Sequence, residues 1–238
     1  MAPVLIYSAV ESCRHLQAAS NGILRLCLRI VMAITQEQVG CALPPRDCYK
    51  LKGIMSTPIQ EVPVRRITGE AATLGDYAGK VLLVVNVASK CGLTPQYEGL
   101  EKLYRTYRDR GLVVAGFPAN DFKSQEPGTN ADIQSFCTTN YGVEFPMFEK
   151  ITVVGEAKHP LYKELIAAKP KAVSTSEVPF AEDLKKYGID PNPEPEILWN
   201  FEKFVVDRDG KVAARFAPNT APEDPALIKV IEEELAKT

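Results

Sequence analysis

The sequence lacks the features that would place it in several familiar classes of protein. No run of about 18 apolar residues occurs in the 238-residue chain, so we expect no segment to span a membrane. The net charge is −2, which offers no basic surface to a nucleic acid. There are two histidines, and the six cysteines include no CxxC pair, so we predict neither a metal site nor a cofactor.

The cysteines that are present are distributed unevenly. Four lie in the first 54 residues, at Cys13, Cys27, Cys41 and Cys48. Only Cys91 and Cys137 lie in the rest of the chain. A secreted domain held together by disulfides would spread its cysteines through the fold. Two thiols in a large domain instead favour an intracellular protein with a redox site, and we expect it in the cytoplasm.

Residues 1–54 differ from the rest of the chain. Their most apolar part, residues 22–34, is interrupted by Arg25 and Arg29, whereas the apolar region of a secretory signal is uncharged. We expect the natural chain to start at Met55, so that residues 1–54 lie outside the fold. A targeting segment and a genuine extra module are the alternatives.

Two strands and the helix between them are predicted most clearly. The apolar runs at residues 80–89 and 112–119 are nearly continuous, as in strands that are buried on both faces. From Thr94 onward the apolar positions recur every three or four residues, which predicts a helix that ends before Gly111. A strand–helix–strand unit of this kind builds a parallel pair of strands.

The remaining pattern predicts a layered α/β domain over residues 55–238. Its expected elements are a hairpin of 62–67 with 70–74, a helix over 131–140 capped by Asn130, a helix over 159–168, a proline-rich surface insertion at 169–196, a hairpin within 197–218 and a closing helix over 225–237. This order favours a small mixed β-sheet with helices on both faces.

Cys91 lies where the first predicted strand meets its helix. The carboxyl ends of parallel strands are common places for chemistry. The start of a helix presents unpaired N–H groups and the positive end of the helix dipole, and both stabilise a thiolate. On these grounds Cys91 is a candidate for a reactive cysteine, although a buried and inert thiol fits the same pattern.

Three stretches of sequence carry a specific resemblance. They are "NVASKCGLTPQY" around Cys91, "GFPANDFKSQEPG" at residues 116–128 and "WNFEKFVVDRDGKV" at residues 199–212. In their order and spacing they resemble the glutathione peroxidase family in its cysteine form, and most closely a bacterial branch of it. The resemblance covers roughly residues 57–237. It implies a thioredoxin-like fold and the reduction of hydroperoxides by a thiol.

The resemblance also implies roles for particular residues. The reactive cysteine of the family falls on Cys91, and its glutamine, tryptophan and asparagine fall on Gln125, Trp199 and Asn200. The resolving cysteine falls on Cys137. Taken alone, these residues have plainer interpretations: an exposed loop glutamine, a core aromatic residue, a turn residue and a small buried thiol. The matching surroundings favour the catalytic roles for all of them together.

We therefore expect an enzyme, a thiol-dependent peroxidase that forms a Cys91–Cys137 disulfide and is recycled by thioredoxin. The alternatives are direct use of glutathione and a thioredoxin-fold redox sensor that passes oxidation to a partner protein. The chain departs from the family at Ala119 and Asp121, where the family often has cysteine and glutamine. A carboxylate at Asp121 would disfavour a nearby thiolate.

Overall fold

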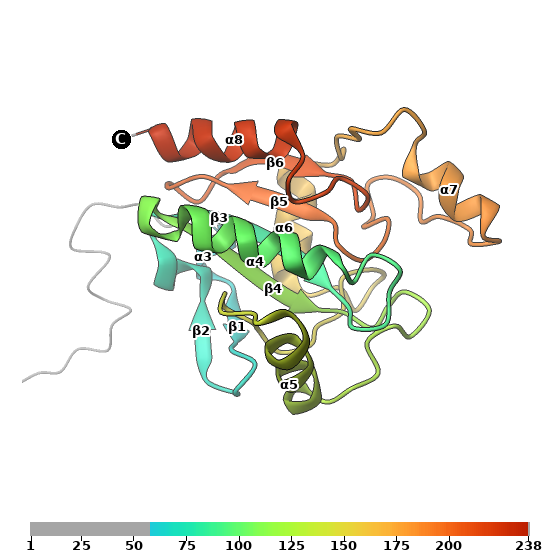
Figure 1. The fold of residues 1–238 in the computed structure, drawn as a ribbon, viewed down its shortest axis with the longest axis horizontal. Coiled ribbons are helices and arrows are strands. Elements are labelled where there is room, and N and C mark those ends of the chain that lie inside the picture. Colours follow the sequence, from blue (N-terminus) through green and yellow to red (C-terminus); the bar gives the residue numbers. More distant parts are fainter. Residues whose placement is uncertain (1–57, 238) are drawn as a thin grey trace, which may run out of the picture. The chain divides into compact units, whose positions relative to one another are not determined.

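A four-stranded mixed sheet forms the centre of the domain (Figure 1). The chain divides into two units, and the computed structural model describes residues 58–237, which belong to the second unit, Gly53–Thr238. Our predictions about residues 1–54 lie outside the described residues. The strand order is β4-β3-β5-β6, with only the β3–β4 pair parallel. The strands are β3 (Val81–Val87), β4 (Leu112–Pro118), β5 (Lys203–Val206) and β6 (Val212–Phe216).

The predicted strand–helix–strand unit is confirmed. All seven residues of β3 are buried, as its continuous apolar run requires. Helix α4 (Gln96–Tyr107) follows, and a short 3-10 turn, η4 (Arg108–Arg110), extends it. The chain then reverses at Gly111, whose φ of 106° suits glycine because it has no side chain to clash.

Helices cover both faces of the sheet, as predicted. Figure 1 shows α4 in front of the sheet and α6 (Pro160–Ala168) behind it. Helix α8 (Pro225–Ala236) is a neighbour of α4, because the Tyr107 hydroxyl donates a hydrogen bond of 2.9 Å to Glu232. His159 caps α6 through its ring nitrogen, which accepts from the backbone N–H of Leu161 at 3.2 Å. The domain is therefore the layered α/β arrangement that a thioredoxin-like fold requires.

The predicted N-terminal hairpin lies beyond the β4 edge of the sheet. It consists of β1 (Pro63–Arg65) and β2 (Ala71–Thr73), flanked by the short helices α3 (Pro58–Glu61) and η3 (Leu74–Tyr77). The extended segment at Phe145–Phe148 connects the two parts, because Met147 bridges to Gly116 of β4 and Phe148 bridges to Arg66. A side chain at position 116 would begin 2.5 Å from the Met147 sulfur, so a larger residue there would displace the Met147 side chain.

Helix α5 (Asn130–Tyr141) begins one residue earlier than predicted, and its expected cap is wrong. The Thr129 side chain caps the helix by accepting from the backbone N–H of Asp132 at 3.2 Å. The Asn130 amide oxygen accepts instead from the backbone N–H of Lys150 at 3.0 Å, a tertiary contact that competes with capping. The helix ends as predicted, at a left-handed Gly142.

The predicted insertion at 169–196 contains a helix that the prolines concealed, α7 (Phe180–Lys186), which lies at the periphery in Figure 1. Both ends of the insertion are held by Arg215 of β6. Its guanidinium donates to the carbonyls of Lys169, Pro170, Pro195 and Glu196 at 2.8–3.1 Å. The same guanidinium pairs with the buried Glu202 at 2.5 Å, so the insertion is fixed at its base.

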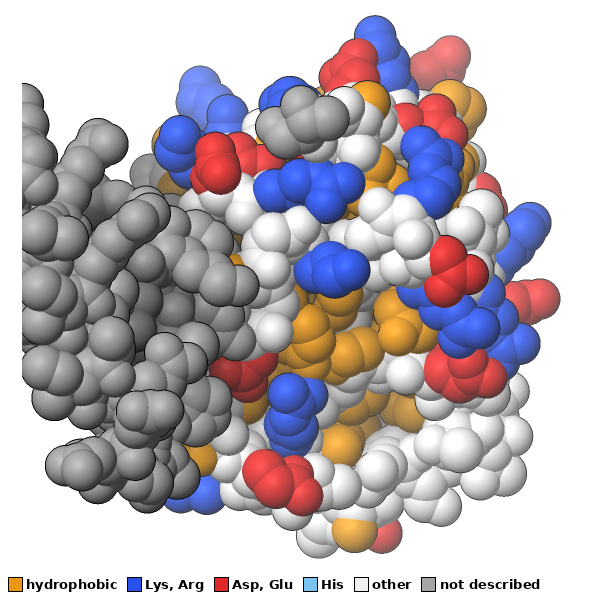
Figure 2. Space-filling view, turned by 90° about the vertical axis from the view of Figure 1, so that its left-hand side faces the viewer, with side chains coloured by type: hydrophobic (Ala, Val, Ile, Leu, Met, Phe, Trp, Pro, Cys, Tyr) orange, Lys and Arg blue, Asp and Glu red, His pale blue; other side chains and the backbone are white. Residues whose placement is uncertain are grey.

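The surface combines charges of both signs. On the face drawn in Figure 2, lysine and arginine side chains lie among aspartate and glutamate side chains, with apolar patches between them. None of the helices within residues 58–237 combines the length and the apolar character that crossing a membrane requires.

Candidate active site

The loop that carries Cys91 leaves the carboxyl end of β3 and is held by hydrogen bonds within itself. The Cys91 N–H donates to the Thr94 hydroxyl at 2.9 Å, and that hydroxyl donates to the Ala88 carbonyl at 2.9 Å. The loop turns tightly enough for the Leu93 N–H to donate to the Cys91 sulfur at 3.3 Å. Helix α4 begins five residues after the cysteine, at Gln96. Cys91 is 7% exposed, so its thiol is nearly buried and faces a backbone donor.

The loop between β4 and α5 brings Gln125 to the same place. The Gln125 carbonyl accepts from the backbone N–H of Lys90, the residue before Cys91, at 3.0 Å. The next residue, Glu126, donates its N–H to the side chain of Asn120 at 2.8 Å, which closes the loop on itself. Gln125 is therefore hydrogen-bonded directly to the residue that precedes the cysteine.

The third predicted stretch contributes a turn between the insertion and β5. The Asn200 amide nitrogen donates to the Gln125 amide oxygen at 2.9 Å, which ties this turn to the Gln125 loop. Asn200 is fully buried, and Trp199 is 6% exposed and packs against Phe122 with ring centroids 5.2 Å apart. The structure thus brings Gln125, Trp199 and Asn200 together beside the Cys91 loop.

Backbone strain is concentrated at the same residues. Within residues 58–237, only Lys123, Ser124 and Phe201 have a positive φ without being glycine, at 52°, 53° and 67°. Each lies within two residues of Gln125 or Asn200. A left-handed non-glycine residue costs about 1–3 kcal/mol, and such strain gathers at functional sites. The positions of these two amides are therefore maintained against a local energetic preference.

Cys137 lies on α5 and is not bonded to Cys91, since both thiols are free. It is 1% exposed, and burial raises the pKa of its thiol to about 11. The charge of Glu126 acts in the same direction on that pKa, while the neighbouring Tyr97 hydroxyl of α4 acts against it. In this state the Cys137 thiol is protonated at neutral pH.

Two carboxyl groups lie near the site. Asp121, which the sequence suggested as a possible disturbance, accepts from the backbone N–H of Val153 at 2.8 Å. Burial raises the pKa of Asp121. We did not predict a role for Glu126, which is 1% exposed and accepts from the Ser89 hydroxyl at 3.0 Å. Burial raises the pKa of Glu126 as well.

A pocket of about 390 Å³ opens between the Cys91 loop and α5. Ser89, Lys90 and Glu126 line it on one side, and Ile133 and Phe136 of α5 on the other. It therefore lies directly beside the Cys91 loop, with a mixed polar and apolar lining.

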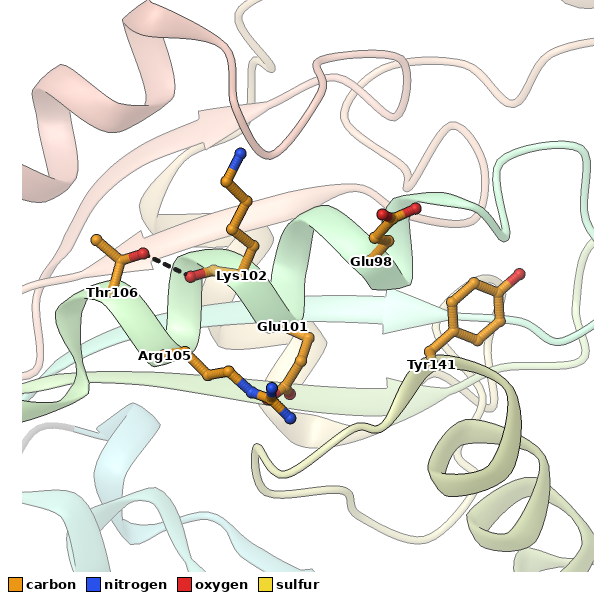
Figure 3. Close-up of a pocket in the computed structure, with 6 residues that line it drawn as sticks. All are labelled: Glu98, Glu101, Lys102, Arg105, Thr106 and Tyr141. Atoms are coloured by element: carbon orange, nitrogen blue, oxygen red, sulfur yellow. Dashed lines mark hydrogen bonds and ion pairs between the residues drawn. The ribbon is translucent and has the colours of Figure 1, made fainter.

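A second pocket, of about 420 Å³, lies between α4 and the far end of α5 (Figure 3). Glu101 and Arg105 of α4 meet there at 2.6 Å, and Tyr141 ends α5 across from them. Arg105 also donates to the Gly142 carbonyl at 3.2 Å, and Glu101 accepts from the Glu144 N–H at 2.8 Å. These bonds fasten the chain just after α5, so this pocket belongs to the support of that helix.

Sequence reasoning missed two further residues that shape the site. Thr94 holds the Cys91 loop, as described above. Asn86 lies in the otherwise apolar β3 and is fully buried, with its amide bonded to the Trp199 carbonyl at 3.0 Å. A single amide inside a continuous apolar run is the signal that could have found it, because a buried polar group needs a partner.

The chain is similar to known proteins over most of its length. The sequence pattern of the family described as glutathione peroxidase matches residues 59–166. A thioredoxin/glutathione peroxidase of Escherichia coli, BtuE, is 53% identical over 183 residues, which is 77% of this chain and 100% of the relative. A hydroperoxy fatty acid reductase of Synechocystis is 47% identical, over 66% of this chain and 85% of the relative.

Solved structures agree with this similarity. GPX1 of T. cruzi is 31% identical to this chain and superimposes with a TM-score of 0.53, over 74% of this chain and 95% of that one. The identity, the coverage and the shared architecture are sufficient to assign the family. The chain belongs to the glutathione peroxidase family.

Proposed function

We propose that Cys91 reduces hydroperoxides, assisted by Gln125, Trp199 and Asn200. The observation that carries this proposal is the connection of three distant segments at the loop that holds Cys91. Lys90 bonds to Gln125, Gln125 bonds to Asn200, and the Leu93 N–H donates to the Cys91 sulfur. Hydrogen bonds to the charged form of a thiol favour the thiolate, which is the nucleophile.

The first step transfers one oxygen atom. The Cys91 thiolate attacks the terminal oxygen of the hydroperoxide, the O–O bond breaks, and Cys91 becomes a sulfenic acid. The departing alkoxide takes up a proton and leaves as an alcohol, or as water when the substrate is hydrogen peroxide. Gln125, Trp199 and Asn200 carry N–H groups that are able to orient the peroxide and stabilise the charge on its oxygens. None of the three titrates near neutral pH, so we assign the proton to water.

Cys137 resolves the sulfenic acid in this proposal. Its thiolate attacks the Cys91 sulfur, the S–O bond breaks, and water leaves with one added proton. A disulfide requires Cα atoms within about 7 Å and Cβ atoms that point toward each other, and we propose that α5 unwinds at least locally to reach this geometry.

Helix α5 is suited to opening. Only Ile133 and Cys137 of this helix are fully buried, and few buried contacts mean a low free energy of local opening. Both ends of the helix are fastened. Lys150 donates to the carbonyls of Glu126 and Gly128 before it, and Arg105 donates to Gly142 after it. Unwinding is thereby confined to the segment that carries Cys137.

A dithiol protein of the thioredoxin type is our choice of reductant, because it reopens a disulfide by exchange. The names of the relatives support both this and the substrate class: one names thioredoxin with glutathione, and another names hydroperoxy fatty acids. We accordingly propose hydrogen peroxide and organic hydroperoxides as substrates. We place the enzyme in the cytoplasm, since the cycle depends on a supply of reduced thiols.

The test is peroxide consumption by the full chain, with thioredoxin and its reductase in one arm and glutathione with its reductase in the other. We expect rapid, saturable turnover with thioredoxin and slow turnover with glutathione. Both substrates are assayed, hydrogen peroxide and a fatty acid hydroperoxide. Faster turnover with glutathione would replace the reductant in this proposal. Oxidation of Cys91 without turnover by either reductant would favour the redox sensor.

A further inference from the structure

The turn at Trp199–Phe201 is held in an unfavourable backbone conformation. Phe201 has a φ of 67°, a value that a bulky residue rarely adopts. It immediately follows Asn200, and its own ring is fully buried against Tyr97, edge to face, with centroids 5.5 Å apart. Such a conformation persists only where the surroundings determine it. The residues that impose it therefore also set the positions of Trp199 and Asn200.

Asn86 of β3 makes three hydrogen bonds to this turn. Its amide nitrogen donates to the Trp199 carbonyl at 3.0 Å, and its amide oxygen accepts from the Glu202 N–H at 3.2 Å. Its backbone carbonyl accepts from the Phe201 N–H at 2.6 Å. The side chain thus spans the turn from the residue before Asn200 to the second residue after it. Asn86 is fully buried, so no water competes for these partners.

Lys203 holds the opposite side of the turn. Its ammonium group donates to the Phe201 carbonyl at 2.6 Å and to the Pro218 carbonyl at 3.2 Å. The Pro218 carbonyl also accepts from the side chain of Gln96, in the first turn of α4, at 2.8 Å. Both backbone polar groups of Phe201 are therefore bonded from outside the turn. Burial lowers the pKa of Lys203 to about 7, but the amine keeps hydrogens to donate in either state.

We propose that Asn86 is a positioning residue for the peroxidase reaction, with Lys203 as its counterpart on the other side of the turn. Asn86 places the Trp199 indole and the Asn200 amide, and through the Asn200–Gln125 bond of 2.9 Å it also places Gln125. This inference rests on the proposed function of those three residues. If Asn86 had a purely structural role, its substitution would lower the stability of the fold but leave the rate of Cys91 oxidation in the folded protein unchanged.

The test substitutes Asn86→Asp. The aspartate has nearly the same shape and still accepts from Glu202, but it loses the donor to the Trp199 carbonyl and places a second oxygen against it. Leu82→Ala is the matched control, because Leu82 lies on the same face of β3, is 2% exposed and pairs with Val206, away from the turn. Both substitutions lower the stability of the fold, but only N86D removes a hydrogen bond to the Trp199–Phe201 turn.

Three readouts separate placement from stability. Oxidation of Cys91 by hydrogen peroxide is followed by the fluorescence of Trp199, the single tryptophan of the chain. Alkylation of Cys91 by iodoacetamide, measured on its peptide by mass spectrometry, needs the thiolate but no placed peroxide. Quenching by acrylamide reports the exposure of Trp199.

We expect N86D to slow oxidation by about 100-fold, the effect of a misplacement of about 1 Å, while alkylation falls far less and quenching increases. L82A should leave all three readouts at the parent values in folded protein. Oxidation at the parent rate in folded N86D, or equal losses in oxidation and alkylation, would overturn the proposal.

A second variant covers the case in which N86D does not fold. Lys203→Met keeps the apolar stem and removes the donor to Phe201, and we expect the same selective loss of oxidation. Parent-like oxidation in folded K203M would overturn the proposal. If peroxide does not oxidise Cys91 in the parent protein, the proposed function fails independently of the role of Asn86. In that event acrylamide quenching still measures the placement of Trp199.

Discussion

Cys91 and Cys137 are both nearly buried free thiols, but the fold holds them in different ways. The Cys91 loop is bonded to Thr94 within itself and to Gln125 outside it. Cys137 lies on a helix that buries only one other residue fully, Ile133. The Cys91 loop fixes its thiol beside hydrogen-bond donors, whereas α5 can open and let the Cys137 thiol move away from its buried position.

The two thiols also differ in the polar groups around their sulfur atoms. The sulfur of Cys91 accepts a hydrogen bond from the backbone N–H of Leu93 at 3.3 Å. Burial raises the pKa of Cys137 to about 11, so its thiol is a poor nucleophile while α5 is folded. Opening of α5 would therefore do two things at once: it would bring Cys137 toward Cys91, and it would restore the ordinary acidity of Cys137. A fixed thiol and a released one should therefore respond differently to substitution and to pH.

Replacing the fixed thiol should have the largest effect. We expect Cys91→Ser to reduce peroxidase turnover to a few per cent of the parent rate or less, because a serine hydroxyl stays protonated at neutral pH. The measurement is peroxide consumption with thioredoxin, alongside a melting curve that shows the variant is folded. Turnover close to that of the parent would place the chemistry at another residue.

Replacing the released thiol should remove turnover but keep the first oxidation. In Cys137→Ser, hydrogen peroxide should still oxidise Cys91 at the parent rate, while thioredoxin-dependent turnover is lost and Cys91 continues to sulfinic acid. Stopped-flow fluorescence and mass spectrometry of the Cys91 peptide measure the two steps. Thr138→Ser, on the exposed side of the same helix, is the control. If C137S turns over with thioredoxin as fast as the parent, Cys137 is only a core thiol.

The sequence predicted those parts of the fold that depend on local pattern. The apolar runs of β3 and β4 and the helical spacing of α4 were sufficient, because a strand buried on both faces leaves little choice of residue. The cap of α5 was wrong because Thr129 and Asn130 are both good caps, and the choice depends on the distant Lys150. Helix α7 was missed because prolines on both sides of it suggested an irregular segment.

The candidate site was predictable only where a motif carried it. Gln125 and Asn200 have no local signal of their own, and the hydrogen bond between them joins residues 75 apart in the chain. The bond from Asn86 to Trp199 spans 113 residues, and no periodicity reveals a contact of that kind. Backbone strain at Phe201 likewise follows from packing in the folded domain.

The smallest expected effect concerns pH and follows from the buried state of Cys137. Its folded pKa of about 11 lies above the ordinary value of about 9, so the folded state favours the protonated thiol. The resulting stability is fully present below about pH 9 and is lost as the pH rises toward 11.

At about pH 10.5 the parent should have lost about 2 kcal/mol more of its free energy of unfolding than C137S has. Groups remote from Cys137 are common to both proteins and cancel in the difference, whereas Tyr97 contributes to it, because Cys137 is one of the groups that raise the Tyr97 pKa. Urea unfolding of both proteins at about pH 8 and pH 10.5 measures it. Equal losses in the two proteins would mean that Cys137 titrates normally, and α5 would then open without any gain in the acidity of its thiol.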